Sequence, residues 1–148
     1  MKKVHYNDLA SHVGQEMGVS DWVLIDQDRV NTFADATGDH QWIHVDVEKA
    51  TKLMGGPIAH GYLTLSLIPM LGAQIVAIEG VSRGINYGSN KVRFTNMVPV
   101  GSKVRARQKL LAVEPKGGGT QMTNEVTIEI EGKDRPACIA ETITLVYP

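Results

Sequence analysis

The amino-acid sequence predicts an α+β fold, in which a curved antiparallel sheet wraps around one long helix. Residues 57–78 contain no Asp, Glu, Lys or Arg, as expected of a helix that protein covers on most sides. The chain after residue 84 reads as strands with one polar and one apolar face. Wrapping these strands around the helix buries both apolar surfaces. The 148 residues suit one domain, which we expect to span residues 1–148.

Short elements are expected at the start of the chain. Residues 7–13 could form a short helix, and residues 21–25 read as a short strand. Asp26 is placed to cap a helix that runs to about Thr37, and Gly38 is placed to end it. Helical segments therefore precede the uncharged one.

A second short helix is expected after Asp46, which can cap it. Val47, Ala50 and Leu53 are spaced to point inward from that helix. A Gly-Gly-Pro break then leads to the uncharged helix, expected from about residue 60 to residue 78.

The second half of the chain is expected to be mostly strand. Segments 84–87 and 90–95 are short candidates, and segment 104–113 belongs to a longer strand. Three consecutive glycines then predict a hairpin loop. Segment 123–131 alternates apolar and polar residues, which indicates a half-buried strand, and segment 137–146 forms the last strand.

Composition excludes several classes of protein. The net charge of -1 argues against a nucleic-acid-binding protein, which would neutralise many phosphates. The uncharged segment holds too many polar and helix-breaking residues for a membrane span. Cys138 is the only cysteine, expected to be a small buried residue, and this usage is compatible with a reducing cytoplasm. The chain starts without an apolar leader segment, so we expect no secretory signal.

The densest polar cluster, GDHQWIHVD, occupies residues 38–46, shortly before His60 and Gly61. Asp39 and His44 can converge if this loop is tight, and such a pair could hold a water and move protons near neutral pH. The free N–H groups of a helix that starts at residue 60 could polarise a carbonyl. Helix capping by the acids and a buried, satisfied histidine remain open alternatives.

Segments 33–46 and 56–63 resemble the signature of the MaoC-like dehydratases and (R)-specific enoyl-CoA hydratases. Segments 86–94 and 98–101 also resemble strands of that family. The resemblance implies a hot-dog fold and a lyase of fatty acid metabolism, which reversibly adds water to a trans-2-enoyl thioester. It implies an acyl-CoA or acyl-carrier-protein substrate and a homodimer. We expect no cofactor and no metal.

The resemblance also assigns residues. Asp39 and His44 match the Asp and His that bind and activate the water, and Gly61 matches the glycine whose backbone N–H contacts the thioester oxygen. His60 and Tyr62, on either side of Gly61, are candidate substrate contacts. Asp46 matches a trailing Asp of the motif, where it can cap a helix.

Two departures from the family pattern stand out. Gln41-Trp42 replaces the common Asn-Pro, and Trp42 could line the acyl pocket or pack over the loop. Pro69 stands where some relatives place a serine that orients the Asp, which leaves Ser66 and Thr64 as nearby candidates.

Other functions remain as alternatives. A hot-dog thioesterase would direct water to the thioester carbonyl, and a non-catalytic acyl-binding module could share the fold. The zinc-ligand spacing is poor and no Gly-x-Ser-x-Gly motif occurs, which disfavours a metal site or a serine hydrolase. Five basic residues could meet CoA phosphates, although a solvated strand face accounts for most of them: Lys91, Arg93, Lys103, Arg105 and Arg107.

Overall fold

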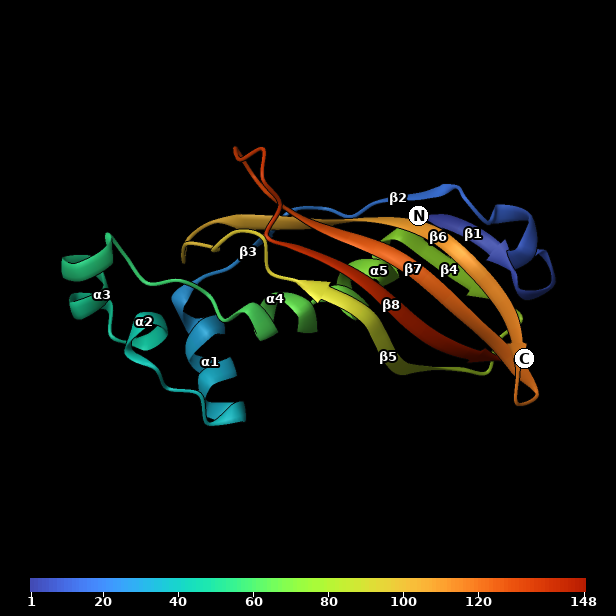
Figure 1. The fold of residues 1–148 in the computed structure, drawn as a ribbon, viewed down its shortest axis with the longest axis horizontal. Helices are drawn as coiled ribbons and strands as arrows, with labels where there is room; N and C mark the ends of the chain where they lie inside the picture. Colours follow the sequence, from blue (N-terminus) through green and yellow to red (C-terminus); the bar gives the residue numbers. More distant parts are fainter.

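The computed structural model describes all 148 residues and confirms the α+β hot-dog architecture. The elements follow one another as β1 (Lys2–His5), the 3₁₀ helix η1 (Tyr6–His12), β2 (Glu16–Val19), β3 (Val23–Leu24), α1 (Gln27–Thr37), α2 (Trp42–Val45), α3 (Val47–Met54), α4 (Gly61–Ser66), α5 (Ile68–Ile75), β4 (Val76–Glu79), β5 (Arg83–Arg93), β6 (Lys103–Lys116), β7 (Gly119–Ile130) and β8 (Cys138–Tyr147). In Figure 1 the long strands curve over α4 and α5.

The main sheet has the order β2-β6-β7-β8-β5, with β3 also paired to β6. All of its pairings are antiparallel, and β6 and β7 form the predicted glycine hairpin. Val126, Ile128 and Ile130 are buried on one face of β7, as their alternation predicted. The separate candidates at 84–87 and 90–95 are one strand, β5, because register shifts near residues 87 and 90 interrupt its pattern without ending it.

The uncharged helix forms the core under the sheet. Leu63, Leu67, Leu71 and Ile75 recur every fourth residue and are all buried. The helix is divided into α4 and α5 at Leu67, just before Pro69, whose missing N–H removes one helical hydrogen bond.

The predicted end of this helix at residue 78 is wrong. The helix ends at Ile75, and Val76–Glu79 forms β4 instead, parallel to β1. The β-branched Val76 and Ile78 favour a strand, and β1, at the far start of the sequence, supplies its hydrogen-bonding partner.

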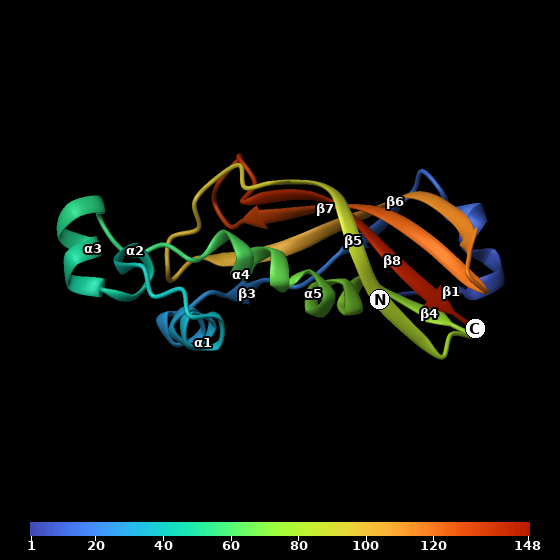
Figure 2. The same cartoon turned by 60° about the horizontal axis from the view of Figure 1, so that its bottom comes forward.

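The face of the helix that points away from the sheet is open. Tyr62 is 69% exposed and Met70 40%, with the exposed Ser66 between them. We expected protein on most sides of this helix, and one chain covers only the face toward the sheet. Figure 2 shows α4 and α5 beneath the strands with this side uncovered.

Helices α1, α2 and α3 form an arm at one end of the molecule, with both termini toward the other end (Figure 1). The caps are as predicted: Asp26 accepts a hydrogen bond from the Arg29 N–H, and Asp46 accepts one from the Lys49 N–H. Gly38 ends α1 in the left-handed conformation, at φ 83°.

The inward orientation expected for Val47 and Leu53 is wrong. Only Ala50 is buried in α3, whereas Val47 is 48% and Leu53 62% exposed. Helix α3 lies at the tip of the arm, past the ends of the strands, so no sheet covers that face (Figure 1). No helix is long and apolar enough to cross a membrane.

Candidate functional site

Asp39, His44 and His60 come together where the arm joins the central helix. Asp39 lies in the loop after α1, His44 lies in α2, and His60 is the residue before α4. One side-chain oxygen or nitrogen from each lies within 4.8 Å of those of the other two. Asp39 is exposed, whereas His44 and His60 are 6% and 2% exposed. The cluster therefore opens to solvent at its carboxylate.

The ring of His44 is held in one tautomer. Its Nδ1 lies 2.6 Å from the backbone oxygen of Ile58. A carbonyl oxygen only accepts, so Nδ1 carries the hydrogen and donates it. In the neutral ring, Nε2 then keeps its lone pair, as required of a proton acceptor.

His60 is held through its other nitrogen. Its Nε2 lies 3.0 Å from the backbone oxygen of Asp39, to which it must donate. Its Nδ1 is buried and has no hydrogen-bond partner in the protein. His60 thus anchors the backbone of the residue that carries the cluster's only carboxylate.

A cavity of about 370 Å³ adjoins this cluster. His44 and Gly61 both line it, together with Ile58, Ala59, Thr64, Phe94, Thr95, Asn96, Met97, Val98, Arg135 and Ala137. The Gly61 N–H begins α4 and has no backbone acceptor. A Cβ built at Gly61 would lie 3.0 Å from the Phe94 ring, so glycine keeps this wall of the cavity open.

Of the two hydroxyl residues considered for orienting Asp39, only one lies at the cavity. Thr64 is buried and lines the cavity with His44. Ser66 faces elsewhere, because its Oγ donates to the backbone oxygen of Tyr62 at 2.6 Å. Pro69 supplies no hydroxyl, so Thr64 is the one of these candidates whose hydroxyl-bearing side chain lines the cavity.

All three predicted substrate contacts, Trp42, His60 and Tyr62, lie outside the cavity lining, and so does Asp39. Trp42 is half-buried, with the Lys49 Nζ 4.6 Å from its ring centre. Tyr62 is exposed and packs edge-on against Phe94, which does line the cavity.

The remaining acidic and imidazole groups of the loop have structural contacts. Asp46 caps α3. The His40 Nε2 lies 2.9 Å from the Asp35 Oδ1, a contact that raises the pKa of this exposed imidazole. Neither residue belongs to the cluster of Asp39, His44 and His60, so the ligand-type residues of this loop, Asp39, His40, His44 and Asp46, do not all come together.

The orientation of the rings in the observed cluster also disfavours a metal. The His44 and His60 rings stack with centroids 3.8 Å apart and planes only 24° apart. A metal bound by both would lie in both ring planes at about 2.0–2.1 Å from each nitrogen. Two nearly parallel, stacked planes meet only far outside both rings.

The sequence prediction missed several residues of this cavity. Phe94 and Asn96 follow β5, and Arg135 comes from the turn between β7 and β8. Arg135 is the one charged residue of the lining. Because Arg135 lies far along the chain from the polar cluster at residues 38–46, no local sequence pattern indicated it.

Comparison with known proteins identifies relatives. The family model described as MaoC like domain matches residues 8–132. The 3-hydroxyacyl-thioester dehydratase Z of Mycobacterium tuberculosis (strain ATCC 25618 / H37Rv) is 56% identical over 138 residues, covering 92% of this chain and 91% of the relative. Nodulation protein N of Rhizobium leguminosarum bv. viciae is 43% identical over 150 residues, covering 99% and 93%.

Solved structures resemble the fold as well. An (R)-hydratase from A. caviae, involved in PHA biosynthesis, superposes with a TM-score of 0.74 at 26% identity, covering 92% of this chain and 96% of that one. The monoamine oxidase regulatory protein from Archaeoglobus fulgidus has a TM-score of 0.77 at 19% identity, covering 100% of this chain and 97% of that one, a likeness of fold alone.

Proposed function

Because this chain belongs to the MaoC-like domain family, we propose that it is a hydro-lyase that reversibly adds water to a trans-2-enoyl thioester. The observation that carries the proposal is the position of His44, which lies within 4.8 Å of the Asp39 carboxylate and also lines the cavity with Gly61, whose N–H is free. His44, one member of the proposed acid–base pair, and Gly61, the proposed oxyanion donor, line the same cavity, which supports the proposal.

In the proposed reaction, Asp39 and His44 bind one water. The water oxygen forms a bond to the β-carbon of the substrate, and one proton of the water passes to the pair. His44 Nε2 is the free acceptor, because Nδ1 is committed to Ile58. The α-carbon then receives a proton, which gives a 3-hydroxyacyl thioester; the reverse sequence is dehydration.

Gly61 has the second role. When water attacks the β-carbon, the double-bond electrons move toward the thioester and negative charge develops on its oxygen. A backbone N–H that points at that oxygen stabilises the charge. The Gly61 N–H is unpaired at the start of α4, whose dipole is positive at this end.

A direct test measures the loss of the conjugated absorbance of crotonyl-CoA. We expect the wild type to hydrate it, and Asp39→Asn and His44→Asn to lower kcat by about 100-fold or more, in the range of acid–base contributions. Asparagine at 44 can still donate to Ile58, so this variant removes Nε2 while supporting the fold. An inert wild type that releases free thiol from acyl-CoA favours the thioesterase, and one that only binds acyl-CoA favours the acyl-binding module.

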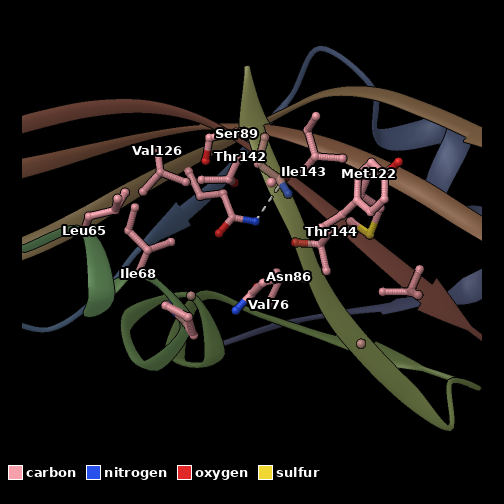
Figure 3. A pocket seen from close by; sticks show the side chains of 18 of the residues that line it. Leu65, Ile68, Val76, Asn86, Ser89, Met122, Val126, Thr142, Ile143 and Thr144 are labelled. Carbon is pink, nitrogen blue, oxygen red and sulfur yellow. Dashed lines mark hydrogen bonds between the residues drawn. The ribbon is translucent and has the colours of Figure 1, made fainter. Parts of the chain in front are cut away.

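We propose that the active form is a homodimer. Strand β5 is an edge strand, and residues 83–91 are exposed along their whole length. A groove of about 770 Å³ separates it from the central helix, and Figure 3 shows Leu65 and Ile68 on one side and Asn86 and Thr144 on the other. None of the residues that line this groove is charged, which suits the uncharged helix face of a second copy.

Light scattering during size-exclusion chromatography tests the dimer. We expect twice the chain mass for the wild type and for Leu53→Glu, which adds a charge at the exposed tip of the arm. Met70→Glu adds the same charge on the open helix face and should give a monomer. A wild-type monomer would contradict the proposal.

Trp42, His60 and Tyr62 remain proposed substrate contacts. Tyr62 packs on Phe94 at the cavity wall, so Tyr62→Ala should change the preference for acyl chain length. A cytoplasmic location is likewise proposed, since Cys138, the only cysteine, is a buried free thiol.

A further inference from the structure

The cavity beside His44 has one charged side chain, and that charge is positive. Its twelve lining residues include hydroxyl and amide groups from Thr64, Thr95 and Asn96, but Arg135 alone carries a full charge. No carboxylate lines it. The cavity is therefore suited to a ligand that is uncharged along most of its length and anionic at one end.

The side chain of Arg135 has no partner of opposite charge in the fold. It is exposed and forms no ion pair, although Asp134 precedes it in the sequence. The strand arginines differ in this respect: Arg105 pairs with Glu129, and Arg107 pairs with Glu129 and Glu16. Neither of them lines the cavity.

The backbone under Arg135 is held firmly. The Asn96 side-chain amide donates to the Arg135 carbonyl oxygen at 3.3 Å. The Thr95 N–H donates to the Ala137 oxygen at 3.0 Å, and the Ala137 N–H donates to the Ile128 oxygen at 2.8 Å. The guanidinium therefore extends from a fixed point on the cavity wall, which lowers the entropy lost when it binds an anion.

We infer that Arg135 binds a phosphate of the thioester carrier, while the uncharged lining contacts the amide-bearing pantetheine arm. The inference rests on the proposed function, which places the thioester at His44 and Gly61 and so sets the direction in which the pantetheine group runs. A guanidinium presents paired N–H donors that match a phosphate, and such charge-assisted bonds are strong. Coenzyme A and the prosthetic group of an acyl carrier protein share this chemistry, since both attach pantetheine through a phosphate.

The test is a binding titration with butyryl-CoA, a saturated thioester that cannot be hydrated, so it is independent of hydration activity. Replacing Arg135 with Gln should weaken butyryl-CoA binding about tenfold, as expected for lost charge-assisted bonds. Lys133→Gln is the matched control, because Lys133 is exposed in the same turn but does not line the cavity. It should bind like the wild type.

Butyryl-pantetheine, which lacks phosphate, gives the second arm of the test. The Arg135→Gln variant and the wild type should bind it equally. Equal loss for both ligands, no loss for butyryl-CoA, or no binding of butyryl-CoA by the wild type would each overturn the inference.

Butyryl-4′-phosphopantetheine separates the two sources of phosphate. A loss with this ligand places Arg135 at the phosphate that both carriers share, and a loss confined to butyryl-CoA places it at a phosphate of the nucleotide. Either result supports phosphate binding. If the titrations behave as expected but crotonyl-CoA is not hydrated, the proposed function fails while the role of Arg135 stands.

Discussion

The imidazole ring of His60 stacks on that of His44, with centroids 3.8 Å apart. Each ring also donates a hydrogen bond to a backbone oxygen near the other histidine. His44 donates to the oxygen of Ile58 at 2.6 Å, and His60 donates to the oxygen of Asp39 at 3.0 Å. These two reciprocal bonds join the loop at residues 39–44 to the segment that leads into α4. We therefore infer that His60 positions the proposed acid–base pair.

His60→Phe should keep the stacked ring but remove the donor to Asp39. The Asp39 backbone would lose one hydrogen bond, and the unfolding free energy should fall by about 1 kcal/mol. Because small misplacements of a catalytic group are costly, kcat for crotonyl-CoA should fall roughly tenfold or more, with less change in KM. His60→Gln, which retains an N–H at a similar reach, should recover part of kcat. Equal kcat values for His60→Phe and the wild type would contradict a positioning role.

Gly61→Ala keeps the backbone N–H, but its methyl should displace that N–H from the thioester oxygen and lower hydration activity by up to about 100-fold, the cost of losing an oxyanion donor. The added methyl would meet the Phe94 ring at 3.0 Å, so the start of α4 or the ring must shift. Because Phe94 is 45% exposed and can yield, stability should change little. Activity and thermal melting measured on the same variant check both expectations. The double variant with Phe94→Ala relieves the contact, and a smaller loss there would assign the effect to the ring.

Thr64→Val should lower kcat about fivefold, the effect of about 1 kcal/mol from one neutral hydrogen bond. The change preserves the shape of a buried side chain and removes only its hydroxyl, which lies in the cavity with His44. Thr64→Ser keeps the hydroxyl and should retain more activity than Thr64→Val. Steady-state kinetics on crotonyl-CoA make the comparison, with Ser66→Ala as a control that faces away from the cavity. If the valine variant were as active as the serine variant, the hydroxyl would have no part in the reaction.

Cys138 should be unreactive in the folded protein. Burial raises the pKa of its thiol to about 11, so at pH 8 roughly one molecule in a thousand carries the thiolate. The folded state binds this proton more tightly than the unfolded state, so the contribution to stability is present below the ordinary thiol pKa. It is lost as pH rises toward 11. A thiol-reactive chromophore at pH 8 should label Cys138 only after denaturant is added, and rapid labelling of native protein would contradict its burial.

The sequence predicts most where the signals are local. Asp26 and Gly38 bound α1 because capping is a property of a few adjacent residues. The alternation in β7 set its buried face in the same way. The end of α5 could not be predicted from local residues, because the strand that follows it, β4, forms only by pairing with β1 at the start of the chain.

The same distinction between local and long-range signals applies to the site. The motif predicted that Asp39 and His44 lie close together, but the hydrogen bond from His60 to Asp39 joins residues 21 positions apart. Phe94 lies just after β5 and Arg135 in the β7–β8 turn, and only the folded sheet brings them to the cavity beside His44. Composition did not predict the open helix face, since the absence of charge indicates burial without naming what buries the helix.

The most direct test of the proposed reaction follows the oxygen of water. Crotonyl-CoA is incubated with the protein in ¹⁸O-labelled water, and the products are separated and analysed by mass spectrometry. Hydration by Asp39 and His44 predicts one ¹⁸O atom on the β-carbon of an intact 3-hydroxybutyryl-CoA, formed by the wild type and not by His44→Asn. Label in a free carboxylic acid released with CoA, or unchanged crotonyl-CoA with the wild type, would contradict it.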